Sequence, residues 1–388
     1  MSAAQLNPHV SAMRCIRCDA RHPVADYYEG CPDCLSTGFP ASLAFDYHLS
    51  ATFDPLRPEQ WLAYPGRPFL GEGRTPLIGL TRLAEEVGVR SLSAKYEGTN
   101  PTGSHKDRMS ALLVQRASDV GAVTVAAASS GNAGVSLAAY AARAGLKCVV
   151  VTTPKMSANW RRAVEMHGAE LLATATAEER WQLVARKARA GEWYPATNYL
   201  TPPVGSNPFG VDGYRAIAFE LFGQSRGDRP TDILVPTSRG DVLWGVAQGW
   251  HDLRKAGLIS ELPRVHAVEP FPRIKRVLKG ADFRDTFPGG SALVSLGGTT
   301  VAFQALAALK LTGGSAVAVD EQDVLQDQSA LARAGLYLEL SSASALTGLR
   351  TLARQGIISP AAHVVLVATS HGYKEEARYE PLPVTSLK

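Results

Sequence analysis

The chain has 388 residues, of which 45% are hydrophobic and 20% are charged. This composition is typical of a globular protein with a large core and about two or three domains, and it excludes a disordered chain. The net charge of +4 is too dilute to indicate nucleic-acid binding. No run of about 18 or more apolar residues occurs, so no membrane span is predicted.

The N-terminal part carries four of the five cysteines. Residues 1–10 lack a basic patch followed by an apolar stretch, so we expect no signal peptide and a cytoplasmic protein. The cysteines form two Cys-x-x-Cys pairs, Cys15 with Cys18 and Cys31 with Cys34. Each pair can give two thiolates to one tetrahedral ion. The alternatives are two disulfides, which a cytosolic chain disfavours, and a redox dithiol, which normally needs one pair. The spacing favours a structural zinc ribbon over residues 12–40.

A proline-bearing linker is predicted over residues 41–72, and the phrase Gly-Arg-Thr-Pro-Leu follows at 73–77. A strand is then predicted over 91–96, and a Pro/Gly turn leads to Lys106, which opens an apolar-periodic helix. The positive end of a helix dipole lowers the pKa of an amine, and a neutral amine can attack an aldehyde. The alternative is an ordinary helix start with Lys106 on its solvated face.

A regular alternation of strands and helices follows. Apolar strands are predicted at 122–128, 148–152 and 170–173, with helices at 135–145, 159–167 and 177–190 between and after them. This rhythm favours a parallel α/β sheet with right-handed crossovers. The loop Ser129–Gly134 joins the first strand to its helix, and its backbone N–H groups and hydroxyls suit a carboxylate. The alternative is a capped strand–helix turn without a ligand.

The second half of the chain continues the alternation. Strands are predicted at 232–235, 265–269 and 363–368, and helices run up to His251 and Arg354. A further helix is expected to open at Gly297–Thr300 and to run towards Leu309. The last strand ends in Thr-Ser-His-Gly-Tyr-Lys at 369–374. Loops at the carboxyl ends of parallel strands converge where ligands bind.

The run Asn-Pro-Thr-Gly-Ser-His-Lys-Asp-Arg at 100–108 resembles the lysine loop of fold-type II pyridoxal-phosphate enzymes, and its flanks resemble the threonine synthase family. Three further loops recur in that family's order, from about residue 73 to residue 374. The resemblance implies an α/β, two-domain fold-type II enzyme with parallel-sheet, Rossmann-like domains behind the small ribbon. The catalytic region would span 73–388, with a smaller subdomain at about 110–205 inserted in the larger one.

The resemblance also implies roles for residues. Lys106 would hold pyridoxal phosphate as a Schiff base and move the Cα proton, Asn132 would contact the ring hydroxyl, and Thr369 would bond the pyridine nitrogen. The phosphate loop would comprise Ser238, Arg239, Gly240 and Asp241. This loop is poor in glycine, Asp241 adds a negative charge, and Arg239 either offsets that charge or faces solvent. The substrate would be held by Ser129, Ser130, Gly131, Ala133, Thr299 and Thr300.

The implied activity is a lyase that eliminates or replaces a group at Cβ or Cγ of an amino acid, with conversion of O-phosphohomoserine to threonine as the class reaction. A homodimer is expected, with no nucleic-acid or membrane partner. The alternatives are a serine/threonine deaminase or a β-replacement enzyme acting on a non-phosphorylated amino acid. A further alternative is a zinc-ribbon binding protein with a non-catalytic fold, which intact Lys106, Asn132 and Thr369 disfavour.

One departure concerns the substrate. Threonine synthases carry a phosphate-binding Arg in the segment that aligns with 207–215, where this chain has Gly210. Either another cation, such as Lys155, Arg161 or Arg215, takes its place, or the substrate carries no phosphate. The sequence therefore predicts that O-phosphohomoserine is a poor substrate and that a smaller 3-substituted amino acid reacts better.

Overall fold

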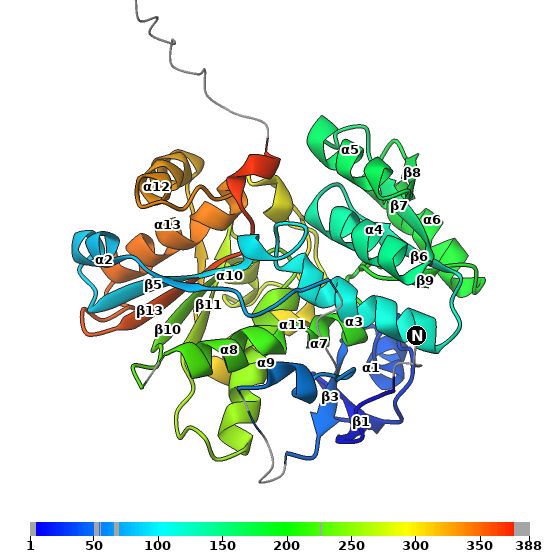
Figure 1. The fold of residues 1–388 in the computed structure, drawn as a ribbon, viewed down its shortest axis with the longest axis horizontal. Coiled ribbons are helices and arrows are strands. Elements are labelled where there is room, and N and C mark those ends of the chain that lie inside the picture. Colours follow the sequence, from blue (N-terminus) through cyan, green and yellow to red (C-terminus); the bar gives the residue numbers. More distant parts are fainter. Residues whose placement is uncertain (1–4, 50–53, 55, 66–69, 226, 376–388) are drawn as a thin grey trace, which may run out of the picture.

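The computed structural model describes residues 5–49, 54, 56–65, 70–225 and 227–375, and it contains three sheets (Figure 1). A three-stranded sheet is formed near the N-terminus, a six-stranded sheet forms the centre of the larger subdomain, and a four-stranded sheet forms the smaller one. Mixed α/β architecture with parallel sheets is what the sequence predicts, and the expected fold class is confirmed.

The N-terminal sheet has the order β2-β1-β3 and is antiparallel. Its elements are β1 (Val10–Cys15), β2 (Arg21–His22), β3 (Leu43–Tyr47) and the short helix α1 (Pro32–Ser36). Strand β3 lies beyond residue 40, inside the predicted linker, so the sheet continues past the expected end of the ribbon. Parts of that linker, 50–53, 55 and 66–69, lie outside the described residues. The 3-10 helix η1 (Pro58–Trp61) follows.

The ribbon is joined to the larger subdomain by buried polar contacts. The Tyr47 hydroxyl donates a hydrogen bond of 2.7 Å to Asp212, and the backbone N–H of Ala63 donates one of 2.8 Å to the same carboxylate. The aromatic ring of Phe45 packs on Phe209 with the centroids 4.9 Å apart. These contacts fix the ribbon against the segment that precedes the helices of the larger subdomain.

The six-stranded sheet has the order β12-β11-β10-β13-β5-β4. All neighbouring pairs are parallel except β4 with β5, which is antiparallel. The last long strand of the chain therefore lies in the middle of the sheet, between strands from the first and second halves. The bounds are β4 (Leu77–Gly79), β5 (Ser91–Tyr96), β10 (Asp232–Pro236), β11 (Arg264–Glu269), β12 (Ala316–Ala318) and β13 (His363–Ala368).

Helices cover both faces of this sheet (Figure 1). One face packs on α2 (Thr81–Val87), α12 (Glu321–Arg333) and α13 (Leu340–Arg354), and the other on α8 (Arg215–Gln224), α9 (Asp241–Lys255) and α11 (Phe303–Thr312). Because both faces are buried, the two central strands, β10 and β13, are almost continuous apolar runs. The helix expected to open at Gly297–Thr300 begins at Phe303 instead, behind an irregular loop. The remaining short helices are η2 (Glu97–Thr99), α7 (Pro208–Asp212), α10 (Ile274–Val277), η3 (Val294–Leu296) and η4 (Gly372–Lys374).

The smaller subdomain has a fully parallel sheet of order β8-β7-β6-β9. Helices α3 (Lys106–Asp119), α4 (Asn132–Ala144) and α5 (Ala158–Met166) cover one face, and α6 (Ala177–Arg189) covers the other. The strands are β6 (Thr124–Ala128), β7 (Lys147–Thr152), β8 (Glu170–Ala173) and β9 (Tyr194–Pro195). In the part of the chain that the structure describes, no helix is long and apolar enough to cross a membrane.

Candidate active site

Lys106 and Thr369 lie side by side at the carboxyl end of the large sheet. Strand β5 pairs with β13 up to Tyr96 and Ala368, so both strands end at the same level. The backbone N–H of His105 then donates a hydrogen bond of 2.9 Å to the Thr369 carbonyl. The chain thus places the residue before α3 beside Thr369, the residue that follows the last strand.

A glycine permits this close approach. Gly103 has φ of +81°, in the left-handed region that favours glycine. A Cβ atom at this position would lie 2.2 Å from Nε2 of His371. The turn before Lys106 therefore depends on Gly103 for its backbone conformation and for the space that the His371 ring occupies.

The Lys106 side chain is half-buried, and its amine contacts a buried tyrosine. Its Nζ donates a hydrogen bond of 3.2 Å to the hydroxyl of Tyr214, a fully buried side chain. Burial lowers the pKa of the Lys106 amine, and the negative charges of Asp241 and Glu339 oppose that shift only in part. A lowered pKa favours the neutral amine, which is the nucleophilic form.

A buried network of ion pairs supports the helix that Lys106 begins. Arg108 donates to Glu97 at 2.7 Å through Nε and to Glu220 at 2.7 Å through Nη1. Lys95 donates to the other oxygen of Glu220 at 2.6 Å. Burial alone would lower the pKa of Arg108, but its two carboxylate partners raise that pKa well above the ordinary value. The arginine of the lysine motif therefore fixes α3 and does not face the site.

The Gly-Arg-Thr-Pro phrase belongs to the same network. The hydroxyl of Thr75 donates to Glu97 at 2.7 Å, and the backbone N–H of Arg74 donates to Glu220 at 2.8 Å. Both carboxylates thus have several donors, as buried charges require. The phrase packs under the active site through these bonds.

Asn132 bridges the two subdomains. It is the first residue of α4, and its Nδ2 donates a hydrogen bond of 2.7 Å to Glu339, the residue before α13. The other oxygen of the Glu339 carboxylate accepts from the hydroxyl of Ser295. Oδ1 of Asn132 is buried and has no hydrogen-bond partner among the described residues. An unsatisfied buried oxygen is a polar group available to a ligand.

The two serines of the loop before α4 have different partners. The Ser129 hydroxyl accepts from the backbone N–H of Gly134 at 3.0 Å and so holds the turn itself. The Ser130 hydroxyl lies 2.9 Å from that of Thr152 and accepts at 3.0 Å from Nη1 of Arg180 on α6. Gly131 lies under the indole of Trp160, and Ala133 follows Asn132 in α4. The Ser130 hydroxyl is thus hydrogen-bonded directly to the guanidinium of Arg180.

The predicted phosphate loop has the geometry of an anion site. Gly240 has φ of +101°, and a Cβ there would lie 2.7 Å from Ala305. Helix α9 begins at the next residue, and no described side chain caps it, so its first N–H groups are available to an anion. Asp241 bonds elsewhere: its carboxylate accepts from the Ser206 hydroxyl at 2.7 Å and from the amide of Gln304.

Arg239 is half-buried and forms no ion pair with Asp241 among the described residues, although the charge of Asp241 raises the pKa of its guanidinium. Its Nε donates a hydrogen bond of 3.0 Å to the hydroxyl of Thr300, and its guanidinium lies 4.8 Å from the centroid of the Trp181 ring on α6. Ser238 lies in the same loop, beside Gly298. The side chain of Arg239 therefore extends from the larger subdomain towards the smaller one. Thr299, next to Thr300, accepts at its carbonyl from the N–H of Phe287 at 2.7 Å.

The structure explains why residue 210 is glycine. A Cβ at Gly210 would lie 2.7 Å from Cγ of Met109 and 3.5 Å from Cβ of Leu113, both on α3. Helix α7 packs so closely on α3 that a side chain here would enter the core. An arginine at this position could not reach the Lys106 amine without moving α7.

The three cations proposed from the sequence as substitutes do not occupy its place. Arg215 is buried in ion pairs with Asp212 at 3.0 Å and Asp252 at 2.7 Å. Lys155 and Arg161 lie exposed on the surface of the smaller subdomain. The expectation that one of these three residues replaces the missing arginine is therefore not supported by their positions.

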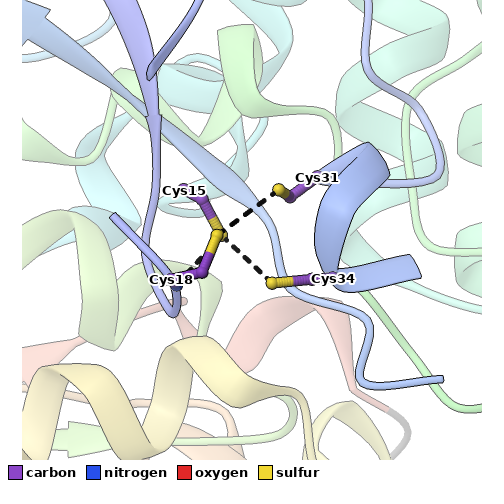
Figure 2. Close-up of side chains that lie close together, drawn as sticks. All are labelled: Cys15, Cys18, Cys31 and Cys34. Carbon is purple, nitrogen blue, oxygen red and sulfur yellow. Dashed lines mark hydrogen bonds between the residues drawn. The ribbon is translucent and has the colours of Figure 1, made fainter. Parts of the chain in front are cut away.

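The four N-terminal cysteines converge on one point (Figure 2). Their Sγ atoms all lie within 4.8 Å of one another, with Cys15 and Cys34 at 3.6 Å and Cys18 and Cys31 at 3.8 Å. A disulfide needs about 2.05 Å between sulfurs, so neither pair is bonded. Zn–S bonds of about 2.3 Å in a tetrahedron place the sulfurs roughly 3.8 Å apart. The donor set and its spacing fit a tetrahedral metal ion.

Several functional neighbours were not identified from the sequence. Tyr214, Glu97, Glu220, Glu339 and Arg180 reach the site or its support only through contacts across the fold. A single tyrosine, glutamate or arginine outside a motif does not indicate a functional role from the sequence alone. The sequence offers one clue, which is the position of Glu97 immediately before the lysine loop.

Comparison with known proteins agrees with this geometry. Residues 68–370 match the family described as pyridoxal-phosphate dependent enzyme. The chain is 32% identical to a threonine synthase of Methanocaldococcus jannaschii over 331 residues, which cover 81% of this chain and 80% of that protein. It is 29% identical to a threonine synthase of Methanosarcina acetivorans, over 94% of this chain and 92% of the relative. The structure of an O-ureido-L-serine synthase is similar in fold, with a TM-score of 0.65 and 22% identity over 80% of this chain and 92% of that one.

Proposed function

This chain belongs to the pyridoxal-phosphate-dependent enzymes and, among them, to the threonine synthase family, and from that premise we propose that it converts O-phosphohomoserine to threonine. It is a pyridoxal-phosphate-dependent lyase of the threonine synthase type that acts on an amino acid. The observation that supports the proposal is the half-buried Lys106 amine, which bonds to Tyr214 and feels the charge of Glu339, the partner of Asn132. The residue before it, His105, bonds to the Thr369 carbonyl. The sequence predicted that O-phosphohomoserine is a poor substrate because residue 210 is a glycine instead of an arginine. The close packing of α7 on α3 explains why this residue is a glycine.

The residues at the site suit the cofactor. The uncapped start of α9, with Ser238 and Gly240, would hold its phosphate, and Thr369 would lie at the ring nitrogen. The unpaired Oδ1 of Asn132 and its Nδ2 would lie at the ring hydroxyl. When bound, pyridoxal phosphate supplies an electron sink that stabilises negative charge next to the substrate Cα. A hydroxyl partner such as Thr369 does not enforce protonation of the ring nitrogen, which suits elimination and replacement.

Lys106 would be both the point of attachment and the proton carrier. Its lowered pKa allows the amine to take the proton from Cα and to return protons at the neighbouring carbons. Tyr214 orients the amine through its hydroxyl, and burial raises the pKa of that hydroxyl well above its ordinary value, so it stays protonated. The N–H groups around Gly131 and Ala133 would hold the substrate carboxylate at the start of α4.

Two measurements test this function. Borohydride reduction followed by peptide mapping should label Lys106, and Lys106→Ala should fold but lose the visible absorption of the bound cofactor and all turnover. Steady-state kinetics should give a higher kcat/KM for O-phosphohomoserine, with release of phosphate and threonine, than for serine or threonine. Faster deamination of serine or threonine would favour the deaminase alternative, and labelling of another lysine would contradict the assignment.

We also propose that Cys15, Cys18, Cys31 and Cys34 hold one structural zinc ion. The support is the separation of their sulfurs, which matches a tetrahedron of thiolates, and a closed set of four ligands leaves no position for substrate. From the family resemblance we further propose a cytoplasmic homodimer. Analytical ultracentrifugation of the purified protein should give twice the chain mass of 41.4 kDa, and a monomer would contradict this.

A further inference from the structure

Two arginines donate hydrogen bonds to residues predicted to hold the substrate. Arg180 lies on α6 of the smaller subdomain, and Arg239 follows β10 of the larger one. Among the described residues, neither forms an ion pair with an acidic side chain. The Nε atom of Arg180 is buried and has no hydrogen-bond partner there. A guanidinium that is partly removed from water without an anion is costly, so the pair needs an anionic ligand.

The two side chains reach towards each other from opposite sides. Arg180 donates to Ser130 in the predicted carboxylate loop, and Arg239 donates to Thr300 in the loop predicted to face the substrate side chain. Trp181, the residue after Arg180, contacts the guanidinium of Arg239 with its ring. An anionic group on the side chain of the substrate would extend into the space between these two loops.

The electrostatic environment of Arg180 and Arg239 also favours an anionic ligand. Burial and the positive charges of Arg273 and Arg180 together lower the pKa of Arg239 to about 10, against the negative charge of Asp241, which raises it. Burial also lowers the pKa of Arg180. The positive charge of Arg180 thus disfavours the charged form of Arg239. Arg273 differs, because Glu269 lies 3.6 Å from its Nε.

We propose that Arg180 and Arg239 form the subsite that binds the anionic leaving group of the substrate, a phosphate monoester, in place of the arginine that Gly210 excludes. The planar fork of a guanidinium matches phosphate oxygens, and two forks from two subdomains would enclose a dianion. Binding of the phosphate would therefore also draw α6 towards the loop after β10. This assignment rests on the proposed function and adds the residues that select the substrate.

The test uses a matched pair of ligands on the cofactor-loaded enzyme. L-2-amino-5-phosphonopentanoate replaces the ester oxygen of O-phosphohomoserine by a methylene group, and L-norvaline has the same carbon chain without the phosphonate. Binding of both is measured by isothermal titration calorimetry. Wild-type enzyme should bind the phosphonate more tightly than norvaline. Arg180→Gln and Arg239→Gln should each weaken phosphonate binding by about 10- to 100-fold, equivalent to about 1.4–2.8 kcal/mol, and should weaken norvaline binding by much less.

Arg186→Gln is the control, because Arg186 is exposed on the same helix α6. Arg180→Lys serves as a second variant at the same position, since it keeps the charge and loses the fork, and it should show an intermediate loss. Equal weakening of both ligands would assign Arg180 to the α-carboxylate through Ser130 and overturn the proposal. Equal losses of cofactor affinity in the two Gln variants would overturn it as well.

The proposed reaction and the proposed subsite can be rejected independently of each other. If the enzyme does not turn over O-phosphohomoserine but binds the phosphonate through Arg180 and Arg239, the subsite stands and the reaction is a different one on a phosphorylated amino acid. If turnover of O-phosphohomoserine is efficient and both Gln variants retain wild-type KM for it, the reaction stands and the subsite is rejected.

Discussion

Nδ2 of Asn132 donates a hydrogen bond of 2.7 Å to the carboxylate of Glu339, although 207 residues separate them in the chain. The bond joins the start of α4 in the smaller subdomain to the start of α13 in the larger one. Ser295 donates to the other oxygen of the same carboxylate. Glu339 therefore sets the position of the asparagine that we assign to the cofactor ring, and it adds a negative charge near Lys106.

Glu339→Gln should change the chemistry of Lys106 while the side chain keeps its shape. Glu339 is one of two acidic groups that raise the pKa of the Lys106 amine against the effect of burial. Its neutralisation should lower that pKa further, so the amine stays neutral at lower pH. The rate at which apoprotein captures pyridoxal phosphate, followed by absorbance, should then keep its maximum to a lower pH than in wild type. An unchanged pH profile would mean that Glu339 acts only as a hydrogen-bond acceptor.

Glu220→Gln should cost about 3–5 kcal/mol in the free energy of unfolding, because it leaves Arg108 and Lys95 buried with too little negative charge. Urea unfolding at pH 7 measures the loss. Glu59→Gln is the control, since Glu59 pairs with the largely exposed Arg74, and such a surface pair is worth about 0–1 kcal/mol. A loss no greater than that of the control would show that the network contributes nothing to stability.

The ionisation of Glu220 should also make the free energy of unfolding depend on pH in the acid range. Burial would raise the pKa of Glu220, but Arg108 and Lys95 outweigh it and hold that pKa at about 2. The unfolded chain takes up this proton near its ordinary pKa of about 4.3. The contribution of Glu220 to stability is therefore complete above about pH 4.3 and is lost as the pH falls towards 2. The free energy of unfolding should fall more steeply over this range in wild type than in Glu220→Gln.

Gly210→Ala should destabilise the protein by about 1–3 kcal/mol, because the added methyl group would meet Met109 in a packed interface. Gly79→Ala is the matched control, since a Cβ there meets nothing within 4 Å. Thermal unfolding of the two variants gives the comparison. Gly210→Arg should be less stable still and should not increase affinity for O-phosphohomoserine. An increase in affinity would show that an arginine at this position can reach the substrate.

Metal removal should affect the ribbon and leave the chemistry intact. Metal analysis should find about one zinc per chain. Cys31→Ser should lower the temperature at which the N-terminal region unfolds, and the visible spectrum of the bound cofactor should not change, because the cysteines contact none of the residues assigned to it. Cys148→Ser is the control, as Cys148 lies in β7, outside the cysteine cluster. A protein that contains no metal would contradict the assignment.

The sequence predicted those parts of the site that are local. Lys106 and Thr369 each follow a strand of the six-stranded sheet within a short motif, and neighbouring parallel strands bring their ends to one edge of a sheet, so the closeness of these two loops could be anticipated. Asn132 follows β6 of the other sheet, and its hydrogen bond to Glu339 across the two subdomains could not be predicted from strand order. The cysteine cluster could be predicted for a similar reason, because two Cys-x-x-Cys turns suffice to define four ligands. The fold class followed from the alternation of apolar strands and helices.

The remaining parts depend on contacts between distant segments. Arg180 lies in a helix whose sequence is that of any amphipathic surface helix, and only the fold turns its side chain towards Ser130. Glu339 and Tyr214 likewise have no motif around them that indicates a ligand. The structural reason for a glycine at position 210 could not be predicted from the sequence either. It lies in the close packing of α7 on Met109 and Leu113 of α3.

The hydrogen bond from Tyr47 to Asp212 also bears on how the chain folds during its synthesis. The carboxylate that receives this bond is made 165 residues after the tyrosine. At about 5–20 residues per second, the ribosome needs roughly ten to thirty seconds to produce it. During that interval the nascent ribbon has no catalytic region to pack on, and its small apolar core cannot hold it together alone. Binding of zinc would stabilise the ribbon over this time, so the metal would act on the newborn chain as well as on the finished enzyme.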